Sequence, residues 1–296
     1  MYVSIRDVIA KECWATLAEA LDALGVRAVE FTFNRACEVK LAAPQNGISS
    51  IALCGESGIE AFAKHLQEYN IKASAFLMAT DFSNDDTEAE IKWVECAVRA
   101  ADALKMDAIR IDAHMHRESD WPLEKRITIF ADCMKRVIDE TSDTDVPMGI
   151  ENHGIQGNTP EFLDRVLDSV GSERLGLTMD TGNFYWAGNP LDDVYRILEH
   201  FAPKTKHTHC KNISYPADIR QTRREAGLDY EKRACPIPEG DIDHNRVVDI
   251  LKAAGYKSDL CLEDESIYWM NDVEKKRQSL VKGIEALKHA AKTCLT

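Results

Sequence analysis

Four residues that could bind a metal ion stand at the ends of four successive short apolar segments. They are Glu151 in PMGIENHG, Asp180 in LGLTMDTGN, His209 in KHTHCKN and Glu263 in DLCLEDES. Three carboxylates buried together would repel one another, and a divalent cation removes that cost. Oxygen ligands with one imidazole suit Mn2+, Mg2+ or Co2+. They are not the ligands of a zinc-thiolate site. The pattern predicts a divalent metal centre, with Mn2+ preferred and Mg2+, Co2+ and Zn2+ as alternatives.

The four segments belong to an alternation of strand and helix patterns that runs along the whole chain. Strands are predicted at 1–6, 27–33, 71–78, 108–114, 147–151, 175–180, 205–211 and 258–263. Helices are predicted at about 12–24, 57–69, 85–105, 122–140, 159–170, 190–202, 242–255 and 273–293. Such alternation predicts an α/β protein with a parallel sheet, and eight units favour a single (β/α)8 TIM barrel over residues 1–296. An open doubly wound sheet is the alternative, but the turn after the first strand, RDVIAKE, lacks the usual glycines.

In a barrel, alternate residues of each strand point inward, and the active site lies at the carboxyl ends of the strands. This parity directs Glu151, Asp180, His209 and Glu263 toward one point. His207 has the same parity as His209 but lies about 6.5 Å deeper along the strand. We therefore expect His207 to support the ligands from behind rather than to bind the metal.

Other polar side chains near the predicted mouth are candidates for substrate contact. His114 ends the inward face of the fourth strand, and Glu30 lies on that of the second. For Glu30, a sugar contact and a structural hydrogen bond are equally expected. Lys211 could contact substrate or pair with a nearby glutamate. Trp186, which follows DTGNFY, could stack on a sugar ring.

The connection at 212–240 is unusually long for a compact domain. Loops of this length are usually functional or disordered. It contains both acidic and basic residues, so it is not a simple anion clamp. We predict an active-site flap, with a disordered insert as the alternative.

Composition excludes several classes of protein. The 296 residues contain 36 Lys and Arg against 50 Asp and Glu, a formal charge of −14, which argues against nucleic-acid and anionic-membrane partners. The sequence contains no apolar run long enough to span a bilayer and no visible secretory signal, so we expect a cytoplasmic protein. Nine cysteines without a CxxC pair suit reduced thiols in the cytosol.

With these residues in place, the sequence resembles the sugar phosphate isomerase/epimerase family, the xylose isomerase-like TIM barrels. The motifs that carry the resemblance are IENHG, MDTGNF, HTHCKN, PEGDIDHNRVVDILKAAGY and CLEDE. The resemblance implies a metal site of Glu151, Asp180, His209 and Glu263, with the two glutamates also moving protons from opposite sides of the substrate. It also implies a homo-oligomer and sugar contacts for His153 and Lys211.

Two departures argue against the apurinic endonucleases of the same superfamily. Asn183 stands where those enzymes place a histidine, and Lys232, Arg233 and Ala234 replace their Asp-x-His pair. We expect Asn183 to contact substrate instead.

The predicted activity is metal-assisted isomerisation or epimerisation, by proton transfer next to the carbonyl of an unphosphorylated keto-sugar, polyol or cyclitol. Glu151 and Glu263 would be the acid and base. One alternative is a dehydratase or lyase acting on a keto-sugar or inosose, with His153, His114 or His207 as the acid. The other is a non-catalytic sugar-binding barrel.

Overall fold

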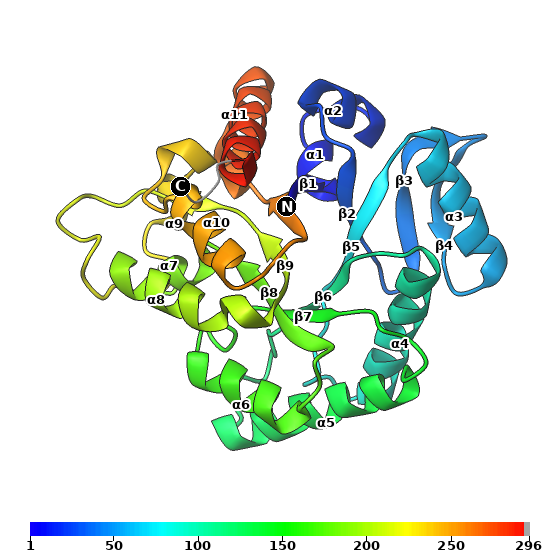
Figure 1. Cartoon of the computed structure of the whole chain (residues 1–296), viewed down its shortest axis with the longest axis horizontal. Coiled ribbons are helices and arrows are strands. Elements are labelled where there is room, and N and C mark those ends of the chain that lie inside the picture. Colours follow the sequence, from blue (N-terminus) through cyan, green and yellow to red (C-terminus); the bar gives the residue numbers. More distant parts are fainter. Residues whose placement is uncertain (293–296) are drawn as a thin grey trace.

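The computed structural model describes residues 1–292, and its centre is a barrel of eight parallel strands, as predicted (Figure 1). The ends of the predicted domain, at 296, and of the closing helix, at 293, lie outside the described residues. The hydrogen-bonded order is β12-β1-β2-β5-β6-β7-β8-β9. The barrel strands are β1 (Tyr2–Arg6), β2 (Ala28–Thr32), β5 (Lys72–Met78), β6 (Ala108–Asp112), β7 (Met148–Glu151), β8 (Leu175–Asp180), β9 (Thr205–His209) and β12 (Asp259–Leu262).

Backbone hydrogen bonds just beyond the last strands close the barrel. Cys210 N donates to Cys261 O at 2.7 Å, and Glu263 N donates to Cys210 O at 3.0 Å. These bonds fix the end of β9 beside the end of β12. As a result, His209 and Glu263 lie next to each other at the mouth.

Helices surround the barrel and bury the outward face of its strands (Figure 1). Ile109, Ile111 and Leu177, which have the outward parity, are fully buried in this layer. None of the helices in the described part of the chain is long and apolar enough to cross a bilayer. The larger helices are α2 (Leu17–Leu24), α3 (Glu56–Glu68), α4 (Thr87–Ala103), α5 (Leu123–Glu140), α6 (Pro160–Val170), α8 (Leu191–Phe201), α10 (His244–Ala253) and α11 (Val273–Lys292).

The first predicted helix, at 12–24, begins too early. The structure has a short helix α1 (Asp7–Lys11) and then α2 from Leu17. The Thr16 side chain accepts a hydrogen bond from Glu19 N, and the Glu19 side chain accepts one from Thr16 N. This reciprocal cap explains why α2 begins where it does.

An antiparallel hairpin that was not predicted follows β2. It consists of β3 (Glu38–Gln45) and β4 (Ile48–Ala52), joined through Asn46 and Gly47. Both turn residues have positive φ, 50° and 79°. An Asn-Gly pair is a strong hairpin signal, so this hairpin could have been predicted from the sequence.

The long connection at 212–240 is folded, so the interpretation as a disordered insert is wrong. Strands β10 (Asn212–Ile213) and β11 (Ala234–Cys235) pair antiparallel, and the segment also contains α9 (Tyr230–Arg233) and the 3-10 helix η2 (Ile237–Glu239). The guanidinium of the buried Arg224 donates to Tyr185 O and Asn189 O. These bonds attach the connection to the segment that follows β8.

Candidate metal centre

The structure brings the four predicted ligands together at the carboxyl end of the barrel. Glu151, Asp180 and His209 are the last residues of β7, β8 and β9, and Glu263 directly follows β12. One ligand atom from each lies within 4.8 Å of one from every other member. All four side chains are buried, with at most 3% exposure. We call these four residues the ligand group.

The charges within the ligand group fit a divalent cation. Asp180 Oδ2 is buried and accepts no hydrogen bond from a described residue, although Lys211 Nζ lies 3.1 Å away. Burial raises the pKa of Asp180, and the Glu151 carboxylate adds to this rise while Lys211 opposes it. Three carboxylates and one imidazole form a donor set used for Mn2+, Mg2+, Co2+ and Zn2+.

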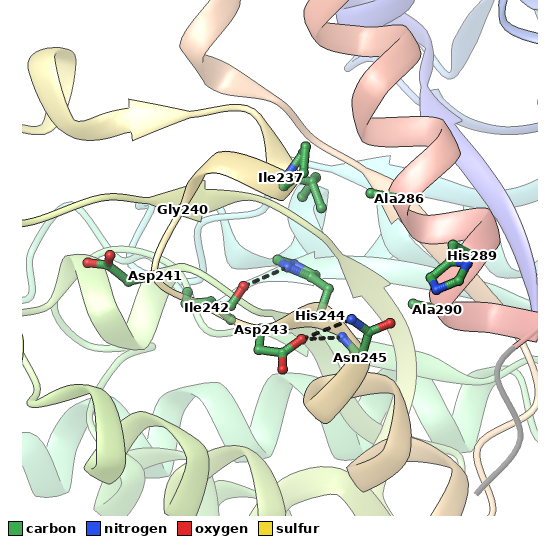
Figure 2. Close-up of a pocket in the computed structure, with 11 residues that line it drawn as sticks. Ile237, Gly240, Asp241, Ile242, Asp243, His244, Asn245, Ala286, His289 and Ala290 are labelled. Atoms are coloured by element: carbon green, nitrogen blue, oxygen red, sulfur yellow. Dashed lines mark hydrogen bonds between the residues drawn. The ribbon is translucent and has the colours of Figure 1, made fainter. Parts of the chain in front are cut away.

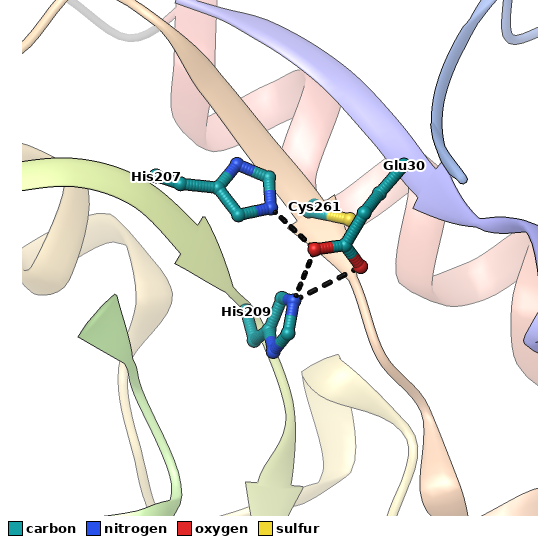
Figure 3. A group of neighbouring side chains, drawn as sticks. All are labelled: Glu30, His207, His209 and Cys261. Carbon is teal, nitrogen blue, oxygen red and sulfur yellow. Dashed lines mark hydrogen bonds and ion pairs between the residues drawn. The ribbon is translucent and has the colours of Figure 1, made fainter. Parts of the chain in front are cut away.

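Both ring nitrogens of His209 have partners that orient the imidazole. Nδ1 lies 3.0 Å from Glu151 Oε1 and 3.6 Å from Glu263 Oε2. Nε2 lies 2.9 Å from Glu30 Oε1 (Figure 3). A proton on Nε2, donated to Glu30, leaves the Nδ1 lone pair directed toward the other ligands.

Glu30 lies behind His209 in a buried chain of polar groups (Figure 3). His207 Nε2 lies 2.9 Å from Glu30 Oε1, and His207 Nδ1 lies 2.8 Å from Asp259 Oδ1. Burial by itself raises the pKa of Glu30, but the His209 and His207 rings lower it below its usual value. Both ring nitrogens of His207 thus face carboxylates, and its supporting role stays a prediction. The Glu30 carboxylate contacts these two imidazole rings and does not point toward the mouth of the barrel.

Each of the two glutamates in the ligand group is paired with an arginine. Arg110 on β6 pairs with Glu151, and its Nη1 also lies 3.0 Å from Asp112 Oδ2. Arg6, the last residue of β1, pairs with Glu263. Neither of these arginine–glutamate contacts was predicted from the sequence. Arg6 ends a predicted strand on the inward parity, so the signal for it was present.

A polar cavity of about 160 Å³ opens beside the ligand group. Lys211 lines this cavity and also contacts the ligand group. Its Nζ lies 3.1 Å from Asp180 Oδ2 and 3.3 Å from Glu263 Oε2. Asn183 Nδ2 is buried and has no hydrogen-bond partner among residues 1–292. The cavity is lined by His153, Gly154, Asn183, Trp186, Lys211, Tyr230 and Glu265.

Four of the six predicted substrate-contact residues therefore line this cavity, whereas Glu30 and His114 do not. β6 ends at Asp112, two residues before His114, so the strand parity does not extend to that histidine. His153 is held by Asp112, whose Oδ1 lies 3.0 Å from its Nδ1. The hydrogen bond to Asp112 raises the pKa of His153.

Three residues of the cavity wall, Gly154, Tyr230 and Glu265, were not among the predicted substrate contacts. Tyr230, from the long connection, donates its hydroxyl proton to Glu265, whose Oε2 also lies 3.1 Å from Lys211 Nζ. Glu265 is, with Glu263, one of the glutamates expected as a partner of Lys211, and both contacts form. Tyr230 carries no comparable signal, because its position depends on how the long connection folds.

A second hollow, of about 410 Å³, lies between the start of α10 and α11 (Figure 2). Its lining includes none of the ligand group. His244 Nδ1 lies 3.2 Å from Ile242 O, and Asp243 accepts a hydrogen bond from Asn245 N. These polar groups stabilise the start of α10.

A family model described as "Xylose isomerase-like TIM barrel" matches residues 10–290. The chain belongs to this family. The expected family and fold are thereby confirmed, and the closed barrel with polar residues at its carboxyl end is the architecture of a xylose isomerase-like barrel.

Comparisons with individual proteins are more distant. The chain is 32% identical to inosose dehydratase of Klebsiella pneumoniae over 117 residues, which are 38% of each chain. It spans less than half the length of the curated relatives it matches. A crystal structure of the IOLI protein with a zinc atom superposes with a TM-score of 0.71 at 17% identity, covering 99% of this chain and 100% of the other. A D-tagatose 3-epimerase-like protein gives 0.65 at 16% identity, with 98% and 99% covered.

Proposed function

We propose that this protein is a divalent-metal-dependent dehydratase acting on an unphosphorylated keto-polyol of the inosose type. The observation that carries the proposal is the position of Lys211. It contacts two members of the ligand group and also lines the cavity with His153. A carboxylate base and proton donors are therefore available to the same bound molecule. The inosose dehydratase relative supports this substrate class.

The reaction removes the proton on the carbon next to the substrate carbonyl. Glu151 or Glu263 accepts this proton. A divalent ion, when bound by the ligand group, supplies the Lewis acidity that polarises a carbonyl oxygen. The neighbouring carbon loses its hydroxyl group, which takes a proton from His153 and leaves as water while a carbon–carbon double bond forms.

The other residues of the cavity orient the substrate. Lys211 and Asn183 donate hydrogen bonds to its oxygens, and Asn183 Nδ2 has no partner among the described residues that would compete. Trp186 offers an apolar face for the ring carbons. Tyr230 and the connection that carries it cover the cavity and exclude water.

Mn2+ is the ion we expect from the oxygen-rich donor set. Zn2+ is the alternative, because the IOLI protein, which has a similar fold, contains a zinc atom. Metal analysis of the protein as purified distinguishes the two.

Isomerisation or epimerisation is the second candidate. It is favoured by the presence of two glutamates in the ligand group, since two carboxylates could serve opposite faces of one substrate. In that case, the proton returns to carbon and no water is lost.

Incubating the metal-loaded protein with inososes and keto-sugars in D2O separates the candidates. A dehydratase produces an unsaturated ketone that absorbs in the ultraviolet, whereas an epimerase or isomerase produces a saturated product. NMR follows the exchange of the substrate C–H in either case. His153→Gln should retain exchange and lose elimination. His200→Gln is the control, because His200 is also paired with an aspartate, Asp164 at 2.8 Å, but lies on α8. Absence of both exchange and product with every substrate would refute the proposal.

A further inference from the structure

Three cysteines that are far apart in the sequence converge outside the barrel. One sulfur from each of Cys37, Cys54 and Cys96 lies within 4.8 Å of the other two. We call them the cysteine cluster. Cys37 and Cys96 are partly buried, and Cys54 is exposed. None of the three belongs to a barrel strand or lines the cavity at the mouth.

The unpredicted hairpin builds this cluster. Cys37 directly precedes β3, Cys54 follows β4, and Cys96 lies on α4, which packs near the hairpin on one side of the molecule (Figure 1). Leu53 N donates to Cys37 O at 2.8 Å, which fastens the two ends of the hairpin together. Cys37 adopts a left-handed backbone with φ of 57°, an uncommon conformation for a residue with a side chain. The thiol of Cys37 lies beside the other two in this backbone conformation.

The surroundings of the cluster offer further ligand groups beside the three thiols. The three cysteines line an open hollow of about 420 Å³ together with Glu56 and Glu95. Lys92 and Arg99 line the same hollow. Burial raises the pKa of the Cys37 and Cys96 thiols, so the bound ion itself must displace their protons. Either carboxylate could provide one further ligand.

We propose that the cysteine cluster is a second metal site, which binds Zn2+ or a similarly thiophilic divalent ion. Three thiols each lose a proton to solvent and bind as thiolates, and Glu56, Glu95 or water takes the fourth position. A tetrahedral ion with Zn–S distances of about 2.3 Å holds its sulfurs about 3.8 Å apart. The observed arrangement, within 4.8 Å, needs only small side-chain movements to reach that geometry.

The site would join the hairpin to α4 and stabilise that region. It stands apart from the proposed catalysis, because it shares no residue with the ligand group. A disulfide between two of the three cysteines is the competing outcome. It would require two sulfurs to approach to about 2.0 Å and would leave the third unused.

Cobalt titration of the full-length protein tests the proposal. The His209→Ala variant is used as background, so that the barrel site is disabled, and the thiols are kept reduced and free of oxygen. Co2+ bound by thiolates absorbs strongly in the near ultraviolet, whereas binding to carboxylates and imidazole does not produce this band. We expect the band to saturate at about one Co2+ per chain and to disappear when Zn2+ is added.

In the same background, Cys54→Ser and Cys96→Ser should each weaken the band severely. Cys133→Ser, at a buried cysteine on α5, should leave it unchanged. Zn2+ should also raise the melting temperature of the background protein but not of its Cys54→Ser variant. Because Cys54 is exposed, serine should be tolerated there without unfolding. The proposal is overturned if the reduced protein shows no thiolate band or if the band survives both substitutions. It is equally overturned if a disulfide within the cluster is the stable form and reduction does not restore Co2+ binding.

Discussion

Replacing Glu30 with Gln should weaken divalent metal binding at the barrel centre about 10- to 100-fold. Glutamine keeps the size of the side chain but loses its charge, and only its amide oxygen can accept a hydrogen bond. In the structure, Glu30 Oε1 lies 2.9 Å from both His207 Nε2 and His209 Nε2. The substitution therefore deprives at least one ring of a charged acceptor.

The magnitude follows from the burial of this contact. Loss of the outer partner of a metal-binding histidine commonly lowers affinity by this factor, or about 1.4–2.7 kcal/mol. We expect the upper part of the range, because Glu30 is only 1% exposed and water cannot easily replace its carboxylate. The new amide group also favours the His209 tautomer with a proton on Nδ1, which points toward the metal position.

Calorimetric titration or competition with a chelator measures the affinity of each variant. Glu90→Gln is the matched control, since Glu90 is 3% exposed and bound to Arg35 and Asn84 at a site away from the ligand group. Both variants should lose stability to denaturant, but only Glu30→Gln should bind metal more weakly. The reasoning is refuted if Glu30→Gln binds within about threefold of wild type or if Glu90→Gln weakens binding equally.

Two further results are expected. Glu151→Gln and Glu263→Gln should each abolish turnover in a folded barrel, because an amide cannot accept the proton. The variant that lacks the base should also lose C–H exchange in D2O. Near-normal turnover in a metal-loaded variant would make that glutamate a ligand only. Burial lowers the pKa of His244 from 6.5 to about 4, so below pH 6.5 the unfolded chain binds a proton that the folded protein does not. The free energy of unfolding should therefore fall between pH 6.5 and 4 by about 3 kcal/mol more in wild type than in His244→Gln. Urea unfolding at several pH values measures this difference. The same pH dependence in both proteins would contradict it.

The barrel and its ligand group were accessible from the sequence because strand parity is a local property. A residue at the end of a predicted strand has a known direction, and neighbouring strands end at the same edge. Glu151, Asp180, His209 and Glu263 could therefore be grouped without coordinates. Strand parity does not extend to His114, because the predicted strand continues beyond the true end of β6 at Asp112.

Other features depend on which side chains meet across the fold. The sequence contains Arg6 and Arg110 but does not reveal that each pairs with a glutamate of the ligand group. Tyr230 lines the cavity only because of the way the long connection folds. The cysteine cluster depends on a hairpin whose Asn-Gly turn was visible but whose packing against α4 was not.

An anomalous X-ray scattering experiment tests the central claim most directly. Crystals grown with Mn2+ are measured above and below the manganese absorption edge, and the difference map locates the ion. We predict one strong peak at the carboxyl end of the barrel, about 2.0–2.3 Å from ligand atoms of Glu151, Asp180, His209 and Glu263. A fully loaded crystal with no peak among these four residues would contradict the account.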